Sequence, residues 1–321
     1  MRKLNIYTFH RGIANHRFDA HNTSELKNIL KTSYDINHHD MNGDDKFIYT
    51  NDCDVLIDQG SILIFEFDDT KQFKVFDFGD SPSITLKLSK SKNFIGASIG
   101  QYNKKLWDLN VLDSEKRNSI KPSVYPESCW NFGLVNFEEI SEYRNNIKLD
   151  NRLYWRGSIY NTTPDPNYRN TRMAIEHLSV KMDSFYFAPF PIMFDDYISE
   201  SINFKIALCF GGGGGYSCGD LCFRDIEMYG LGIPTLRPKF AIETDDPLIP
   251  NEHYISVDCK FDNRYRYTEN ESLAENIIKR YHEVINDDDY LKYIASNARE
   301  WYIRNATGPN ITNKIVETLG I

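Results

Sequence analysis

Arg224 and Glu227 are the two residues whose types and spacing point most directly to ligand chemistry. They stand three positions apart in a segment with a helical pattern, so both side chains face the same way and can point at one ligand. An arginine suits a diphosphate because its planar guanidinium binds two oxygens at once, and a carboxylate suits the paired hydroxyls of a ribose. The pair therefore predicts a site for a nucleotide diphosphate. The competing interpretation is a solvated helix face that happens to carry two charges.

A run of five glycines, Gly211 to Gly215, precedes this helix. Glycine has no Cβ, so backbone N–H groups in such a run can approach a phosphate closely, and the following helix N-terminus adds its positive dipole end. We expect the phosphate or the sugar to be contacted by Gly213, Gly214 and Gly215. A glycine run can also mark only a flexible turn. The apolar strand expected after the helix favours the first interpretation, because it completes a strand-helix-strand unit.

Strand-like and helix-like segments alternate through the second half of the chain, where both features lie. Strands are expected at 153–155, 184–188, 206–210, 234–236 and 253–257, and helices at 169–179, 220–229, 272–286 and 287–305. This alternation predicts a parallel sheet with helices on both faces. Ligands of such sheets bind at the carboxyl ends of the strands, where the glycine run is expected.

Apolar runs in the first half predict another α/β domain. Strands are expected at 3–9, 47–50, 54–57, 61–67, 73–78 and 93–98, with a helix around 23–32. The polar stretch 143–151 is typical of a linker, so we expect domains at 1–145 and 150–321. The amphipathic pattern of 287–305 predicts a C-terminal helix that could pack back across both domains.

Three further segments hold uncommon residues in a suggestive order: FDFGDSPS at 76–83, YPESCWNF at 125–132 and YWRGS at 154–158. Together with the glycine run and Phe223-Arg224, this order resembles the protein O-glucosyltransferase and capsule-associated glycosyltransferase family. The resemblance covers roughly residues 75 to 240, and Trp155-Arg156-Gly157-Ser158 is its most specific part. It implies the GT-B fold, in which two Rossmann-like domains face each other across a cleft. It also implies inversion at the anomeric carbon of the transferred sugar.

The same resemblance implies that Asp80, in Gly79-Asp80-Ser81-Pro82, is the catalytic aspartate, although the family has an arginine where Gly79 stands. A base is needed because an acceptor hydroxyl that attacks the anomeric carbon must lose its proton. A partly buried carboxylate suits that task, since burial raises its pKa. Asp-Ser-Pro is also ordinary turn chemistry. His10, which follows the first expected strand, is the rival base.

Arg156 and Gly157 are expected at the end of the first strand of the second domain, facing the cleft. Arg156 could hold the donor phosphate and Gly157 would allow its close approach, whereas the alternative is a structural pair in which Arg156 stacks on Trp155. Arg169 and Arg172 form a second basic pair on the next helix. Either could neutralise the leaving diphosphate, because without a metal the arginines and helix dipoles must supply that stabilisation.

Metal-binding patterns are weak in this sequence. The triplet Asp52-Cys53-Asp54 and the pair Asp68-Asp69 could in principle hold a divalent ion beside a diphosphate, but in a single-domain enzyme where the glycine run has no role. His38-His39-Asp40 lacks a further ligand at metal-binding spacing, and the six cysteines show no paired spacing. We therefore expect no metal and no cofactor, with the nucleotide sugar as co-substrate.

Composition limits the partners. The formal net charge of −9 over 321 residues argues against a broad nucleic-acid surface. No apolar segment approaches the length of a membrane span, so we expect no membrane span and a cytoplasmic location. The Asn-, Ile- and Lys-rich composition is typical of an AT-rich genome, for example a viral one.

These features together favour a metal-independent glycosyltransferase. A nucleotide-diphosphate sugar, most simply a UDP-sugar, would bind the second domain, and a glycan or small-molecule hydroxyl would bind the first. Two alternatives stay open. One is a DNA-modifying glycosyltransferase that acts on a hydroxylated base, which requires a basic track and a flipped nucleotide. The other is a non-catalytic protein that binds nucleotide sugars or glycans.

Overall fold

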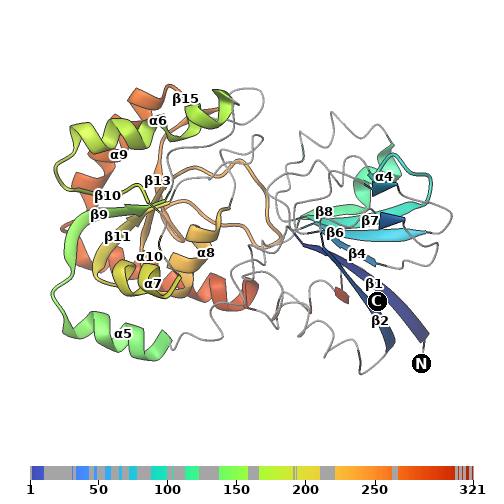
Figure 1. Cartoon of the computed structure of the whole chain (residues 1–321). Helices are drawn as coiled ribbons and strands as arrows, with labels where there is room; N and C mark the ends of the chain where they lie inside the picture. The colour runs from blue at the N-terminus through green and yellow to red at the C-terminus, as the bar shows by residue number, and fades with distance from the viewer. Residues whose placement is uncertain are drawn as a thin grey trace. The chain divides into compact units, whose positions relative to one another are not determined.

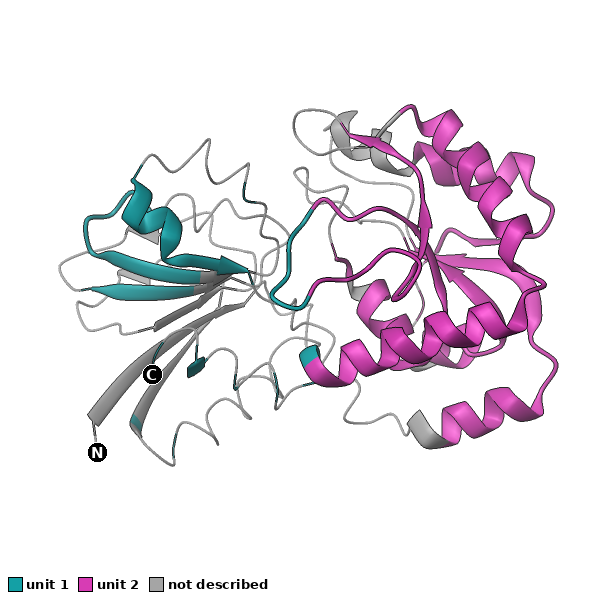
Figure 2. Cartoon of the chain, turned by 180° about the vertical axis from the view of Figure 1, so that it is seen from behind, with its two compact units in different colours: residues 1–134, 242–246, 305–321 teal, residues 135–241, 247–304 magenta. Residues whose placement is uncertain are grey.

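The chain forms two compact α/β units, each built on a parallel sheet (Figures 1 and 2). The computed structural model describes residues 2–10, 31, 34–42, 47–48, 55–58, 65–66, 72–77, 88–99, 104, 113–122, 137–157, 166–190, 192, 194–209, 221–261, 267–307, 310, 313, 316–317 and 320. Unit 1 comprises Met1–Leu134, Ile242–Asp246 and Asn305–Ile321, and unit 2 comprises Val135–Ala241 and Pro247–Arg304. The first boundary thus falls before residue 135, whereas the sequence suggested residue 145.

Unit 1 contains a six-stranded sheet in which all neighbouring strands are parallel. Its strands, in spatial order, are β2 (Tyr34–Asn42), β1 (Arg2–His10), β4 (Val55–Asp58), β6 (Phe73–Asp77), β7 (Phe94–Ile99) and β8 (Ile120–Pro122). A separate parallel pair is formed by β3 (Phe47–Ile48) and β5 (Phe65–Glu66). The short helix α4 (Ser114–Asn118) precedes β8 and is capped by Asp113, whose carboxylate accepts from the N–H groups of Glu115 and Lys116.

Unit 2 contains a five-stranded parallel sheet covered by helices on both faces. Its strands, in spatial order, are β10 (Phe185–Ala188), β9 (Asp150–Arg156), β11 (Phe204–Leu208), β12 (Thr235–Pro238) and β13 (Ile255–Val257). In Figure 1, α6 (Pro166–Lys181) and α9 (Asn270–Val284) lie on one side of the sheet, and α7 (Phe194–Ser201) and α8 (Phe223–Gly230) lie on the other. The helix α10 (Asp288–Asn305) runs beside α8, where the rings of Trp301 and Tyr229 meet edge to face. A small antiparallel pair joins β14 (Lys260–Phe261) to β15 (Tyr267–Thr268).

The central strands of unit 2 are buried on both faces, as the continuous apolar runs predict. Leu153, Tyr154 and Trp155 of β9 are each at most 1% exposed. Leu153 and Trp155 pack in one core with residues of α6, α9 and α10, whereas the ring of Tyr154 lies against Tyr186 and Phe204. The order of the elements in unit 2 confirms the alternation of strands and helices that was expected in this half of the chain.

Residues 143–151 were expected to form a linker, but 143–146 belong to the helix α5 (Phe137–Asn146) and 150–151 begin β9. Hydrogen bonds of Arg144 explain why this polar segment is ordered as a helix. Arg144 Nη1 donates to the backbone oxygens of Ile202 (2.7 Å) and Phe204 (2.9 Å), which ties the polar helix α5 to the start of β11. No helix in the described part of the chain is both long and apolar enough to span a membrane.

Candidate functional site

The sheet of unit 2 changes its direction of winding between β9 and β11. Along the chain its strands are numbered 2-1-3-4-5 in spatial order, so the connections from β9 and β11 lead to opposite sides of the sheet. In open α/β sheets, ligands bind at the carboxyl ends of the two strands that flank such a switch point. In unit 2 this position lies where β9 ends at Arg156 and where the chain leaves β11 toward α8.

Arg224, in the first turn of α8, reaches back to the end of β9. Its Nη2 donates to the backbone oxygen of Arg156, and its guanidinium carbon lies 5.4 Å from the ring centroid of Trp155. Burial by itself lowers the pKa of the Arg224 guanidinium, but the neighbouring ionisable groups, led by Tyr197, raise that pKa overall. Arg224 therefore remains a cation at the switch point, stacked on an aromatic ring.

Gly157 lies directly against this guanidinium. A Cβ placed on Gly157 would lie 2.9 Å from Arg224 Nη2 and 3.3 Å from Trp155 Cζ2, so no larger residue fits unless these side chains move. The Gly157 N–H donates to the backbone oxygen of Ala188 at 3.0 Å, which joins the ends of β9 and β10. The absence of a side chain at this position leaves room for Arg224.

Arg156 is held by a helix that the sequence analysis did not identify. Its Nε and Nη2 make a bidentate ion pair with Glu200 of α7, at 2.8 Å and 2.5 Å, and its Nη1 donates to the backbone oxygen of Phe190 at 2.9 Å. Hydrogen bonding to Glu200 is the main cause that raises the pKa of Arg156. The expected alternative, in which Arg156 stacks on Trp155, is not what the structure shows, because Arg224 occupies that ring face.

Glu227 lies one helical turn after Arg224 and is half-buried. Its negative charge acts on two neighbours: it contributes to raising the pKa of Tyr197 and of Arg224. The buried Tyr154 of β9 likewise has a raised pKa, first through burial and then through the charge of Glu200. The site thus combines two guanidinium groups with two carboxylates at one edge of the sheet.

The two residues of this cluster on α7, Tyr197 and Glu200, were missed by the sequence analysis. The α7 segment FDDYISES follows two prolines, and its eight residues are too few to show a clear helical period. The only available signal was the position of these residues after β10, whose carboxyl end lies at the same edge of the sheet as that of β9.

The other expected site residues are placed less fully. Arg172 lies in α6 and His10 is the last residue of β1, but only their backbone is described. Asp80 lies outside the described residues. So do Gly213, Gly214 and Gly215. The carboxylate pairs considered as metal ligands, at 52–54 and 68–69, also lie outside. Within the described ranges no group of three or more His, Cys, Asp or Glu side chains is arranged to hold a metal ion.

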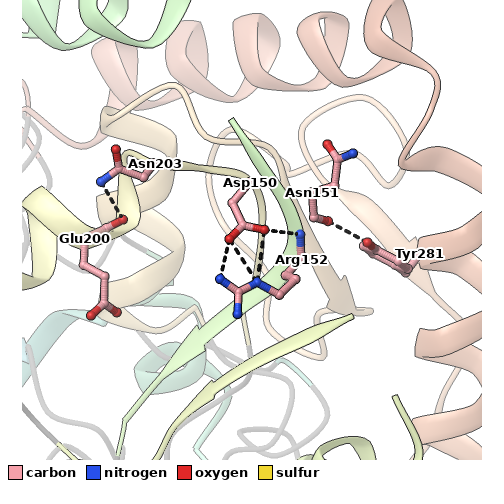
Figure 3. A network of polar contacts seen from close by, with 6 residues as sticks. All are labelled: Asp150, Asn151, Arg152, Glu200, Asn203 and Tyr281. Carbon is pink, nitrogen blue, oxygen red and sulfur yellow. Dashed lines mark hydrogen bonds and ion pairs between the residues drawn. The ribbon is translucent and has the colours of Figure 1, made fainter. Parts of the chain in front are cut away.

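The opposite, amino-terminal end of β9 carries a further arginine, Arg152 (Figure 3), whose guanidinium carbon lies 5.0 Å from the ring centroid of Tyr186. Arg152 pairs with Asp150, with 2.9 Å between Arg152 Nε and Asp150 Oδ2, and both lie at the surface. The pair lowers the pKa of Asp150 through its hydrogen bond to Arg152. Arg152 lies on the same strand as Arg156 but at its other end. Its substitution therefore serves as a control for substitutions of Arg156 and Arg224.

No protein-family description matches the sequence, and no curated protein matches it. Solved structures do match, over almost the whole chain. HepE from Anabaena, in complex with UDP and glucose, is 10% identical with a TM-score of 0.56, and the match covers 99% of each chain. A glycosyltransferase from Rickettsia africae is 12% identical with a TM-score of 0.53 and covers 99% of this chain and 98% of that one.

An alpha-glucosyltransferase in complex with UDP and a 13-mer DNA containing an HMU base also matches, at 11% identity and a TM-score of 0.53, covering 99% of this chain and 100% of that one. At these identities the similarity concerns the fold. The chain therefore has an α/β fold with parallel sheets that is similar to that of GT-B glycosyltransferases, as expected from the sequence.

Proposed function

We propose that the protein is a glycosyltransferase that moves a sugar from a nucleotide-diphosphate sugar, specifically a UDP-sugar, to an acceptor hydroxyl. The observation that carries this proposal is the cluster of Arg156, Arg224 and Glu227 at the switch point of unit 2. Guanidinium groups there suit a diphosphate, and a carboxylate one turn along the same helix suits the ribose hydroxyls. The similarity in fold to structures that contain UDP supports the choice of nucleotide.

Arg224 is assigned the main contact with the diphosphate. Glu200 already covers the Nε and Nη2 edge of Arg156, so Arg156 has fewer donors left for a ligand. The backbone N–H groups of Gly213, Gly214 and Gly215 complete the phosphate site, and Arg172 adds positive charge from α6. As the bond between the anomeric carbon and the diphosphate oxygen breaks, its electron pair goes to the diphosphate, and these cations stabilise the added charge.

The acceptor hydroxyl forms the new bond to the anomeric carbon and gives up its proton to a base. Asp80 is the first candidate, through its resemblance to the catalytic aspartate of protein O-glucosyltransferases, and His10 is the second. The resemblance to that family favours inversion of the anomeric centre. No metal or other cofactor is assigned a role, because arginines and helix dipoles can stabilise the leaving group.

The acceptor is assigned to unit 1, and a glycan or small-molecule hydroxyl is the first choice because the net charge is −9. A hydroxylated base in DNA is the second candidate, favoured by the similarity to the alpha-glucosyltransferase bound to DNA. Retention on DNA at several salt concentrations separates the two. Binding that falls steeply with salt supports a DNA acceptor, and no retention at low salt excludes it.

The proposal is tested by titrating UDP into the wild type, Arg224→Ala and the matched control Arg152→Ala in a calorimeter. Loss of charged hydrogen bonds of about 1.5–3 kcal/mol predicts that Arg224→Ala binds UDP roughly 10- to 150-fold more weakly. Arg152→Ala should bind like the wild type. UDP-sugar hydrolysis or transfer, measured with and without EDTA, then tests turnover and metal independence. Absence of UDP binding to the wild type contradicts the proposal, and binding without turnover favours the non-catalytic alternative.

A further inference from the structure

A fully buried ion pair joins the first turn of α8 to β12. Arg237 Nη1 lies 2.5 Å from Asp225 Oδ2, and both side chains are 0% exposed. Removing two charges from water is costly, and replacing a buried ion pair with well-packed apolar residues often leaves stability unchanged or raises it. Stability alone is therefore a poor explanation for this pair. Such pairs can instead select one arrangement of the elements that they join.

Asp225 bonds to the start of α8 as well as to Arg237. The same oxygen, Oδ2, accepts from the backbone N–H of Cys222 at 2.9 Å and from the Cys222 thiol at 3.1 Å. This is a capping box, in which the third residue of α8 bonds back to the residue that begins it. The position of Asp225 therefore determines where α8 begins.

Arg237 is itself immobilised on the strand side. Its Nε donates to the backbone oxygen of Pro238 at 3.0 Å, and its guanidinium carbon lies 3.3 Å from the ring centroid of Phe240. A guanidinium held at two edges and on one face has little freedom to follow a moving partner. The ion pair therefore holds the first turn of α8 at a fixed position relative to β12.

Arg224 immediately precedes Asp225 and points to another strand. Consecutive helical residues are turned by about 100° around the axis. Asp225 contacts Arg237 of β12, whereas Arg224 contacts Trp155 and the backbone oxygen of Arg156 in β9. The first turn of α8 is therefore held from two different strands.

We propose that Asp225 and Arg237 are positioning residues that set the rotation of α8, so that the Arg224 guanidinium is pre-organised for a diphosphate. This inference rests on the proposed function, because it assigns the pair's effect to the site through Arg224. Neither residue is assigned a contact with the ligand. A site residue supported in this way binds its ligand more tightly, since less freedom is lost on binding.

The test is the double variant Asp225→Leu/Arg237→Met, which removes both charges together. The double variant is expected to unfold at a denaturant concentration close to that of the wild type, because removal of the buried charges offsets the loss of the Asp225 cap. UDP should bind at least tenfold more weakly, and the amides of residues 222–226 should exchange hydrogen at least tenfold faster without ligand. The matched control is Lys205→Met/Asp288→Leu, which removes an ion pair between β11 and the start of α10. This control should change neither the UDP affinity nor the hydrogen exchange of residues 222–226.

A stable double variant with wild-type UDP affinity and wild-type exchange at 222–226 overturns the inference. If the wild type itself does not bind UDP, the proposed function fails, and the exchange measurement alone decides whether the pair holds α8. If the double variant does not fold, Arg237→Lys replaces it. This variant keeps the charge but loses the contacts with Pro238 and Phe240, so we expect severalfold weaker UDP binding, and unchanged affinity and exchange would count against the pair.

Discussion

Gly157 controls how closely the backbone of β9 approaches Arg224. In Gly157→Ala the added Cβ would lie 2.9 Å from Arg224 Nη2, so the end of the Arg224 side chain must shift from its present position. We expect UDP to bind about tenfold more weakly, equivalent to about 1.4 kcal/mol, because part of the charged contact is lost. Calorimetric titration of UDP measures this change directly.

Gly232→Ala is the matched control for that prediction. Gly232 follows the C-cap residue of α8 with φ of 63°, and a Cβ there would meet only Arg299 Cδ at 4.0 Å. The left-handed backbone makes alanine unfavourable by about 1 kcal/mol, so the free energy of unfolding should fall while UDP affinity stays unchanged. Equal losses of UDP affinity in both variants would mean that α8 as a whole, rather than the room beside Arg224, determines binding.

The choice between Asp80 and His10 as base is also decided by single substitutions. If Asp80 accepts the proton, Asp80→Asn should lower turnover by about 10² to 10⁴ and leave UDP affinity intact, because an amide cannot act as the base. His10→Gln should then retain most turnover. The reverse result, measured as sugar transfer at saturating UDP-sugar, would assign the base to His10.

The spacing of Arg224 and Glu227 was sufficient to predict their place on one helix, and Trp155-Arg156-Gly157 was correctly expected at a strand end. The partner of Arg156 could not be predicted. Glu200 lies 44 positions away, and no local pattern links the two. The contact of Arg224 with Trp155 could not be predicted for the same reason, because the position of Arg224 over that ring depends on how α8 packs on the sheet.

The helix α5 depends on one partly buried arginine, Arg144. Burial lowers the pKa of Arg144 to about 10, so it is still charged at neutral pH, and it binds two backbone oxygens. Arg144→Ala leaves both oxygens without this donor, and we expect a loss of about 2–3 kcal/mol in the free energy of unfolding. Denaturant unfolding should show this loss, whereas Arg152→Ala, at the exposed end of β9, should change stability by less than about 1 kcal/mol. Equal stabilities of the two variants would contradict the anchoring role of Arg144.

Central strands were predictable because each contains a short run of residues buried on both faces, such as Leu153-Tyr154-Trp155 in β9. The two edge strands of the unit 1 sheet, β2 and β8, were missed. The β2 sequence YDINHHDMN is mostly polar, and an edge strand pairs through its backbone on one side only. The helices α5 and α7 were not predicted for a related reason, since both are short and rich in charged or polar residues.

The two units share one plan of strand order. In unit 1 the order β2-β1-β4-β6-β7-β8 also reverses after the first strand, so His10 ends the strand that flanks this second switch point. Each unit thus places one of the expected site residues at the position where such sheets bind ligands. The sequence could not show that 242–246 and 305–321 group with unit 1, because that grouping depends on contacts between segments far apart in the chain.

Photolabelling with 5-azido-UDP, followed by peptide mass spectrometry, tests most directly where the nucleotide binds. We predict that the label appears in peptides of unit 2 that follow β9, β10 or β11, and that excess UDP prevents it. Arg224→Ala should reduce the labelling, while Arg152→Ala should not. Labelling that is confined to peptides of unit 1, or that excess UDP does not displace, would contradict a nucleotide-diphosphate site at the switch point of unit 2.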